Sequence, residues 1–271
     1  MEPHQINHGV LHRKQKPTYS EIKSDKFKPS NNGTGLKVIY GGYAKCGTKT
    51  IAAACRRLNL VVYDYEEMSL YTTDHWLEFY NSRTTTERRK EILYEMLNHA
   101  DVVLDMPFYF YWKELMDVFP KAKVIFFARE EDQWYNSFME QARVATQRFY
   151  SVPDRLHWLF NWLFMPSVAK MLKVRKKFIP LQLGETPKYF RNWSWKFYKY
   201  NEHLVRRKYR QNNADILQNC PKDKLLVLDS MNAGFKPICE FLNLPLPPDC
   251  EWPHCNVAGG RNDKFTYYCT N

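Results

Sequence analysis

Five short apolar segments, separated by stretches of helical spacing, constrain the fold of this chain more than any other feature. They lie at residues 36–40, 60–63, 102–104, 124–128 and 225–228. Their apolar residues are continuous rather than alternating, which is typical of parallel strands covered by helices on both faces. Helical spacing follows the first segment and recurs at residues 87–99, 108–118 and 133–147. The sequence therefore predicts an α/β fold, a doubly wound parallel sheet of the P-loop type, with a helical insertion at about residues 145–215.

The first 35 residues differ from the rest in composition. They carry many Lys, Pro, Asn and Ser residues and end in Asn31-Asn32-Gly33-Thr34-Gly35, which predicts a flexible basic arm at residues 1–35. We expect residues 36–271 to form one domain. The arm lacks the apolar run of a signal peptide, and no stretch approaches the roughly 20 apolar residues that cross a bilayer. The 7 cysteines favour free thiols, so a cytoplasmic location is expected.

Basic residues outnumber acidic residues in this chain. Lys and Arg total 40 against 29 Asp and Glu, which gives a formal charge of +11. An excess of this size favours an anionic partner, whether nucleic acid, an acidic membrane surface or a phosphorylated cofactor. No metal is expected, because Cys250, His254 and Cys255 form no paired CxxC and lie in a Pro-rich segment.

A glycine-containing loop follows the first apolar segment and runs from Gly42 to Thr50. Such a loop before a helix is where α/β folds bind phosphate, through free N–H groups and the helix dipole. Gly42 and Gly47 have the Walker A spacing, but Thr48 stands where that motif has Lys, and Lys45 lies inside the loop. No GxGxxG is present, which argues against a dinucleotide-binding oxidoreductase. Taken alone, the loop fits an ordinary strand-to-helix turn equally well.

A second charged segment follows the strand expected at residues 123–128. Arg129 stands directly after this strand, and Ser137 lies on the helix that comes next. The carboxyl ends of parallel strands form the ligand-binding edge of open α/β sheets. A guanidinium and a hydroxyl at that edge suit a second phosphate. The alternative is a surface ion pair of Arg129 with Glu130 or Glu131.

These motifs together resemble those of a known family. Lys45-Cys46-Gly47-Thr48 is similar to the Lys-Ser-Gly-Thr loop of cytosolic sulfotransferases, which binds the 5′-phosphosulfate of 3′-phosphoadenosine 5′-phosphosulfate (PAPS). Arg129 with Ser137 resembles the family's pair for the 3′-phosphate. The resemblance extends from Leu36 to about Pro253, and residues 224–246 look like the closing strand and helix of an invertebrate and fungal branch.

The chain departs from the family pattern at three places. Cys46 replaces the usual Ser, Thr50 stands where many members carry an adenine-stacking Trp, and Gly259-Gly260-Arg261 replaces a clear Arg-Lys-Gly. The resemblance implies a metal-independent enzyme that transfers a sulfuryl group from PAPS to a hydroxyl or amine of a small acceptor. It is also compatible with a homodimer.

The resemblance further implies a role for each residue of the site. Lys45 is expected at the bridging oxygen that leaves with the phosphate. The residues expected to bind the cofactor are Lys45, Cys46, Gly47, Thr48, Lys49, Thr50, Arg129, Ser137 and Arg261.

The base is expected at Asp105. Family members commonly place His two residues before a Pro after the third strand, and the sequence here is Leu104-Asp105-Met106-Pro107. A carboxylate there can accept the acceptor's proton, although its ordinary pKa near 3.9 makes it a weak base unless burial raises it. Alternatively, Asp105 caps the helix expected near Phe108.

Aromatic residues near the expected site suggest where an acceptor binds. Phe108, Tyr109, Trp158 and Trp162 are candidates for an apolar pocket, with core packing as the alternative. Two other functions compete. A P-loop nucleotide or nucleoside kinase is disfavoured by the misplaced Lys and the lack of a well-placed acid for Mg²⁺. A basic nucleic-acid-binding protein would explain the charge but not the Arg and Ser pair, so no nucleic-acid partner is expected.

Overall fold

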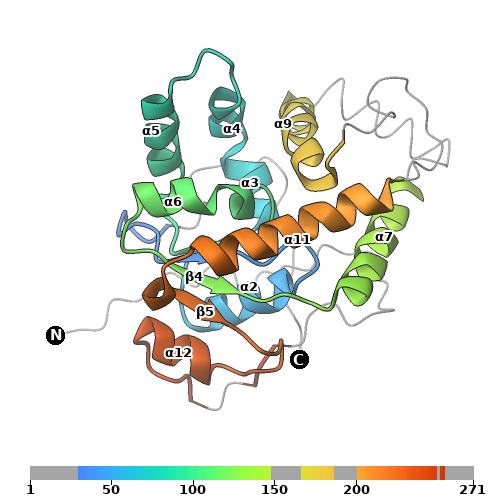
Figure 1. The fold of residues 1–271 in the computed structure, drawn as a ribbon. Helices are drawn as coiled ribbons and strands as arrows, with labels where there is room; N and C mark the ends of the chain where they lie inside the picture. Colours follow the sequence, from blue (N-terminus) through green and yellow to red (C-terminus); the bar gives the residue numbers. More distant parts are fainter. Residues whose placement is uncertain (1–29, 148–165, 186–199, 249–250, 254–271) are drawn as a thin grey trace, which may run out of the picture.

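The structure is a computed structural model that describes residues 30–147, 166–185, 200–248 and 251–253 (Figure 1). It contains a parallel five-stranded sheet in the order β2-β3-β1-β4-β5. The strands are β1 (Val38–Tyr40), β2 (Val62–Tyr63), β3 (Val102–Val103), β4 (Lys123–Phe126) and β5 (Leu225–Val227). They coincide with the five apolar segments, so the predicted α/β fold with a parallel sheet is confirmed.

The first strand occupies the middle of the sheet. Val38 of β1 lies opposite Val102 of β3 on one side and Lys123 of β4 on the other. The chain forms β2 at one edge before β3 fills the place between β2 and β1, and then adds β4 and β5 on the other side. In sheets of this kind the crevice beyond the carboxyl ends of the central strands is the usual place for a ligand.

Helices cover both faces of the sheet. Val38 and Tyr40 are buried against α2 (Thr48–Arg57) and α12 (Lys236–Leu242), whereas Ile39 belongs to the larger cluster on the opposite face. Successive strand residues point to opposite faces, so one strand serves two cores. The helices of the larger cluster are α3 (Tyr65–Tyr71), α4 (Thr73–Phe79), α5 (Thr86–Leu97), α6 (Trp112–Val118), α7 (Glu131–Gln147), α9 (Pro166–Leu183) and α11 (Glu202–Asn219).

Local capping signals fix where several helices begin. Thr85 accepts a hydrogen bond from the Arg88 N–H at 3.2 Å at the start of α5. Asn201 accepts one from the Leu204 N–H at 3.3 Å at the start of α11. Side-chain oxygens at these positions satisfy N–H groups that have no partner inside the helix. Between β2 and α5 the chain forms α3 and α4, which the apolar spacing did not reveal. Two short 3₁₀ helices, η2 (Phe108–Tyr111) and η3 (Lys222–Lys224), precede α6 and β5.

The end of the predicted basic arm is attached to the sheet layer. The Asn31 N–H donates to the His99 carbonyl at 2.8 Å, and the Gly35 N–H donates to the Asn98 carbonyl at 3.0 Å. The Asn31 side chain also donates to Asp101 Oδ1 at 3.0 Å. The bonded part of the chain thus starts a few residues before Leu36. Residues 1–29 lie outside the described residues.

Within the described residues, the α-helices α7, α9 and α11 lie between β4 and β5 in sequence, where the insertion was expected. In Figure 1, α11 crosses in front of the sheet, with α7 beyond one of its ends and α9 packed against it. Residues 148–165 and 186–199 of this region are outside the described ranges. Across the residues that the structure describes, no helix has the length and apolar character needed to cross a bilayer.

Candidate functional site

The carboxyl edge of the sheet carries the charged residues of the candidate site. Lys45 follows β1, Asp64 directly follows β2, Asp105 follows β3 and Arg129 follows β4. β1 lies between β3 and β4, so Lys45 lies between a carboxylate and a guanidinium, and both influence its pKa. The fold therefore gathers four charges that are far apart in sequence.

The loop between β1 and α2 has the geometry of an anion site. Lys45 and Gly47 both adopt the left-handed backbone conformation, with φ of 72° and 75°. Two features require glycine at residue 47. Any other residue would be strained in this backbone conformation, and its Cβ would overlap the Met231 sulfur. No side chain caps α2, and its first turn has no acidic residue. The N–H groups that open α2, at Thr48 and Lys49, therefore lack an acceptor within the helix and favour a bound anion.

The loop is held from beneath by buried groups. The Tyr40 hydroxyl donates to the Cys46 carbonyl, and the Cys46 N–H donates to the Tyr43 carbonyl at 2.9 Å. The Cys46 side chain is fully buried, its Sγ lies 3.8 Å from the Tyr209 hydroxyl, and burial raises the pKa of its thiol. Cys46 was expected among the cofactor-binding residues, but its thiol and its N–H both face protein, so it supports the loop instead.

The two lysines of the loop have different surroundings. Lys49 Nζ pairs with Asp64 Oδ2 at 2.6 Å. Burial alone would lower the pKa of Lys49, but the Asp64 carboxylate together with other nearby carboxylates outweighs burial, and the net pKa is raised. The pKa of Lys45 is lowered, mainly by burial and also by Arg129, with Asp105 opposing. Among the described residues no ion pair within 4 Å involves Lys45. Of the two lysines of the loop, Lys45 is therefore the one whose charge no carboxylate contacts.

Asp64 is a further charged residue of the candidate site, and no sequence motif predicted it. Its side chain is nearly fully buried and forms a capping box at the start of α3, where Glu67 Oε2 accepts from the Asp64 N–H at 3.0 Å. Asp followed three residues later by Glu is a known helix-start signal. That signal could have located α3, but not the contact with Lys49.

Asp105 lies on a left-handed backbone position, with φ of 67°, and its Oδ1 accepts from the Met106 N–H at 2.8 Å. The alternative role as a helix cap is wrong, because η2 is preceded by Pro107 and no side chain caps it. Burial and the negative charge of Asp64 raise the pKa of Asp105 to about 6, against the opposing influence of Lys49, the Met106 N–H and Lys45. A carboxyl group with this pKa is a stronger base than an ordinary one.

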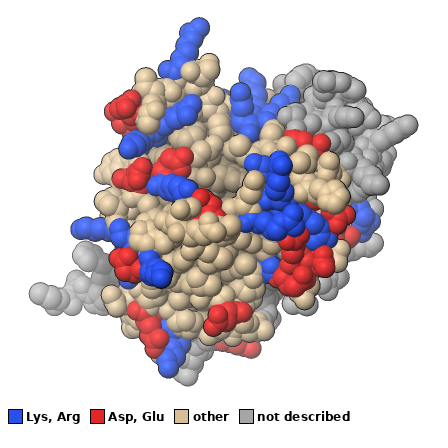
Figure 2. All heavy atoms as spheres, viewed as in Figure 1, with Lys and Arg blue, Asp and Glu red and all other residues tan. Residues whose placement is uncertain are grey.

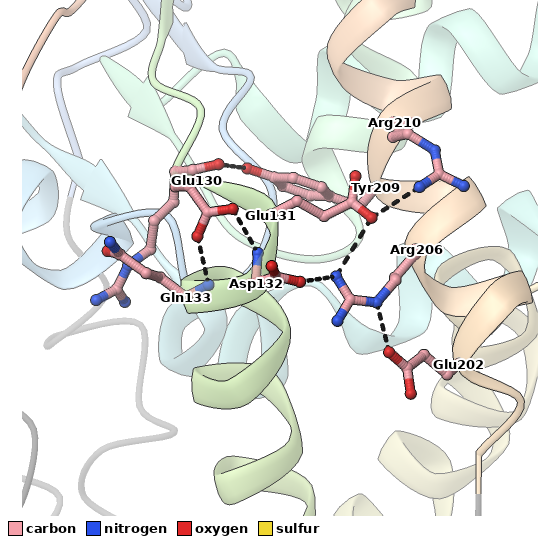
Figure 3. Close-up of polar contacts among 9 residues, drawn as sticks. Glu130, Glu131, Asp132, Gln133, Glu202, Arg206, Tyr209 and Arg210 are labelled. Atoms are coloured by element: carbon pink, nitrogen blue, oxygen red, sulfur yellow. Dashed lines mark hydrogen bonds and ion pairs between the residues drawn. The ribbon is translucent and has the colours of Figure 1, made fainter.

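Arg129 does not use the acidic residues that follow it. The Glu130 carboxylate accepts from the N–H groups of Asp132 and Gln133, both at 2.9 Å. Glu131 pairs with arginines of α11 (Figure 3). In the part of the chain that is described, no ion pair involves Arg129. The alternative of a surface pair with Glu130 or Glu131 is thus wrong, and Ser137 lies half-buried further along α7.

The predicted acceptor pocket is only partly within the described residues. Phe108 and Tyr109 are fully buried. Phe108 packs on Trp76 at 5.7 Å between ring centroids and Tyr109 on Tyr43 at 4.7 Å. Their assignment to a pocket wall is therefore corrected to core packing. Trp158, Trp162 and Arg261 lie outside the described residues, as does the Cys250, His254 and Cys255 group. The described residues hold no cluster of three or more His, Cys, Asp or Glu that could bind a metal.

Comparison with known proteins identifies the family of the chain. Residues 37–260 match the family of the sulfotransferase domain. The match covers most of the chain, which therefore belongs to the sulfotransferase domain family, as the loop and Arg129 motifs predicted.

The chain is also similar to a curated protein, the Ava biosynthesis cluster protein M of Aspergillus versicolor. The two are 27% identical over 246 residues, which is 86% of each chain. The relative's name refers to a biosynthesis cluster and states neither a reaction nor a substrate.

Proposed function

We propose that this member of the sulfotransferase family transfers a sulfuryl group from PAPS to a hydroxyl or amine of a small acceptor. The observation that carries the proposal is a pair of cations, Lys45 and Arg129, that have no acidic partner within 4 Å among the described residues. They follow β1 and β4, which are neighbours in the sheet. PAPS carries negative groups at the 5′ and 3′ positions of its ribose, so the two cations suit its two ends.

The loop before α2 would hold the 5′ end of the cofactor. The start of α2 provides free N–H groups there, and its first turn has no acidic residue to compete for them. The residues at this start are Gly47, Thr48, Lys49 and Thr50. The chemistry of this donor set, N–H groups plus an uncompensated ammonium, fits a phosphate. It needs no metal ion to complete it.

Lys45 would supply the charge that the transfer step requires. When bound, PAPS supplies the sulfuryl group and a phosphate leaving group. The Lys45 ammonium lies in a half-buried position where charge interactions are stronger than in water. Its lowered pKa, caused mainly by burial, also makes it a readier proton donor than an ordinary lysine.

Asp105 would accept the proton of the acceptor. With a pKa raised to about 6 by burial and Asp64, its carboxyl group is mostly ionised at neutral pH yet more basic than an exposed Asp. Asp105 and Lys45 influence each other's pKa, so base and cation belong to one site. The left-handed backbone at both residues is the kind of strain that a functional site retains.

Arg129 and Ser137 would bind the 3′-phosphate, with Arg261 as a further candidate from outside the described residues. The acidic residues nearest Arg129 in sequence are engaged in capping α7 and in pairing with α11. This leaves the guanidinium available for a phosphate, which it can bind through two parallel hydrogen bonds.

A thermal-shift titration of the purified chain tests the cofactor assignment. We expect stabilisation by 3′-phosphoadenosine 5′-phosphate (PAP), the product of PAPS, in the absence of Mg²⁺. A kinase would instead require Mg²⁺ with ATP, and a nucleic-acid-binding protein would bind oligonucleotides in a strongly salt-dependent manner. Either of these results, without a response to PAP, would overturn the proposal.

Sulfuryl transfer itself is tested by incubating the chain with labelled PAPS and a panel of small phenols, alcohols and amines. The expected result is a sulfated product whose mass has increased by one sulfuryl group. The matched control is Lys45→Met, which should bind PAP but form little product.

A further inference from the structure

Tyr209 of α11 touches both segments of the proposed cofactor site. Its hydroxyl donates to the Arg129 carbonyl at 2.5 Å and accepts from the Cys46 thiol at 3.8 Å. Cys46 lies in the loop of residues 42–50, which is named the phosphate loop after its proposed ligand. We propose that Tyr209 is a positioning residue that sets the spacing between the phosphate loop and Arg129. This inference rests on the proposed function and names the device that adapts the site to a nucleotide with phosphates at both ends.

Trp134 completes the connection from the α7 side. Its ring stacks on the Tyr209 ring, with centroids 4.0 Å apart and an interplanar angle of 7°. Its indole N–H donates to the Ala44 carbonyl in the phosphate loop at 2.8 Å. Both side chains are almost fully buried. The stacked pair therefore joins three pieces of chain: the phosphate loop, the Arg129 segment and α11.

Ion pairs fix α11 against the start of α7 and so fix Tyr209. Arg206 pairs with Glu131 at 3.3 Å, with Asp132 at 2.7 Å and with Glu202 of its own helix at 2.7 Å. Arg210 pairs with Glu131 at 2.7 Å. In Figure 3, Arg206, Tyr209 and Arg210 of α11 lie along the residues that begin α7. A network of this kind holds one register between two helices even where each exposed pair contributes little stability.

The polar atoms distinguish a positioning role from simple packing. A phenylalanine at residue 209 would fill the same core space and keep the stacking, but it would lose the contacts to Arg129 and Cys46. The phosphate loop and the Arg129 segment would then each keep their backbone conformation, while the distance between them became less well defined. A ligand that engages both segments at once depends on that separation, because a preset geometry removes the cost of ordering the site. A ligand that engages only one segment does not.

The test compares two nucleotides on Tyr209→Phe. PAP has phosphates at both ends, whereas adenosine 5′-monophosphate lacks the 3′-phosphate. We expect PAP to bind about tenfold more weakly to Tyr209→Phe than to the wild type, the size of one lost hydrogen bond, and the monophosphate to change by less than about twofold. Equal weakening of both nucleotides, or no weakening of PAP, would overturn the positioning role.

Tyr135→Phe is the matched control at the same helix interface. The Tyr135 ring is covered by Arg206 at 4.3 Å and its hydroxyl interacts with Glu202. We expect this variant to bind both nucleotides as the wild type does. A loss on PAP equal to that of Tyr209→Phe would show that any disturbance of the interface suffices and would contradict a specific role of Tyr209.

Hydrogen exchange separates this inference from the proposed function. Without nucleotide, Tyr209→Phe should exchange faster than the wild type at the amides of residues 44–50 and 127–131 together. This measurement decides the positioning role even if the wild type binds no PAP, an outcome that would reject the proposed function alone. Unchanged exchange in both segments would overturn the positioning role whatever the nucleotide results.

Discussion

The phosphate loop and the β4–α7 junction differ in how nearby acidic residues relate to their cations. In the loop region, Lys49 is compensated by the buried Asp64, and Lys45 lies under the influence of Asp105. At the junction, Arg129 is followed by Glu130, Glu131 and Asp132 in sequence, yet none of these carboxylates pairs with it. The comparison teaches that the acids near a cation in sequence do not decide its availability. What decides it is whether those acids have other partners.

The two regions also differ in what they offer to an anion. The loop offers backbone N–H groups at the start of α2, shaped by the left-handed Lys45 and Gly47. The junction offers the guanidinium of Arg129, whose backbone carbonyl accepts a hydrogen bond from the Tyr209 hydroxyl. Anion binding at the loop thus depends on backbone conformation, whereas anion binding at the junction depends on a side chain that has no ion-pair partner among the described residues. Side-chain substitutions should therefore affect the two regions differently.

The largest expected effect is that of Lys45→Met. Removing the uncompensated ammonium should lower kcat for sulfuryl transfer by about 10³-fold, while PAP affinity falls by less than about tenfold because the N–H groups of α2 remain. Steady-state kinetics and PAP titration measure the two quantities. Lys37→Met, which removes a half-exposed lysine paired with Asp101, is the control and should leave both unchanged. Retained turnover in Lys45→Met would remove this lysine from the mechanism.

Asp105→Asn should lower kcat by about 10²-fold and keep PAP affinity. The wild-type rate should rise with pH through about 6, the pKa to which burial and Asp64 raise this carboxyl. A raised pKa means that the folded state favours the protonated form, so the stabilisation it gives is lost as pH rises through about 6. At pH 7 the Asn variant should therefore unfold at a temperature no lower than that of the wild type.

Thermal unfolding and a pH–rate profile check this pair of expectations. Asp117→Asn, which changes an exposed carboxylate on α6, should alter neither. Full activity of Asp105→Asn with a wild-type pH profile is the result that would reject Asp105 as the base.

Arg129→Ala sharpens the contrast between the two proposed phosphate sites. Loss of charge-assisted hydrogen bonds should weaken PAP binding by roughly 30-fold, about 2 kcal/mol, and leave adenosine 5′-monophosphate binding nearly unchanged. Arg143→Ala removes an exposed arginine that pairs with Glu140 of its own helix and serves as the control. If the binding of both nucleotides is weakened equally, Arg129 does not bind the 3′-phosphate.

The smallest expected effect belongs to Asp64→Asn, which tests the acidic side of the loop region. Asp64 is among the causes that raise the pKa of Asp105, so the acid limb of the pH–rate profile should move to lower pH. Asn is itself a good N-cap residue, so α3 should persist, as circular dichroism can verify. A limb that moves to higher pH, or not at all, would mean that the two carboxylates do not interact in the working enzyme.

Sequence patterns predicted the sheet well because strands and helices are local. Continuous apolar runs such as Val38–Tyr40 require burial on both faces, and that requirement alone selects a parallel sheet covered by helices. Helices α3 and α4 were not predicted from apolar spacing, although the Asp64 and Glu67 capping box marks one start. Phe108 and Tyr109 were misplaced because an aromatic run reads the same whether it lines a pocket or fills the core.

The sequence by itself determined the fold class, the family and the identity of the cations, since each depends on residue type and short spacing. Only the tertiary structure decided which charges are compensated and how the loop of Lys45 and the Arg129 segment are joined. Lys49 meets Asp64, and Tyr209 meets both Cys46 and Arg129, across separations in sequence that no local pattern spans. These contacts arise because the parallel sheet brings distant strand ends to one edge. At that edge burial and neighbouring charges, rather than residue type, set the pKa and the availability of each group.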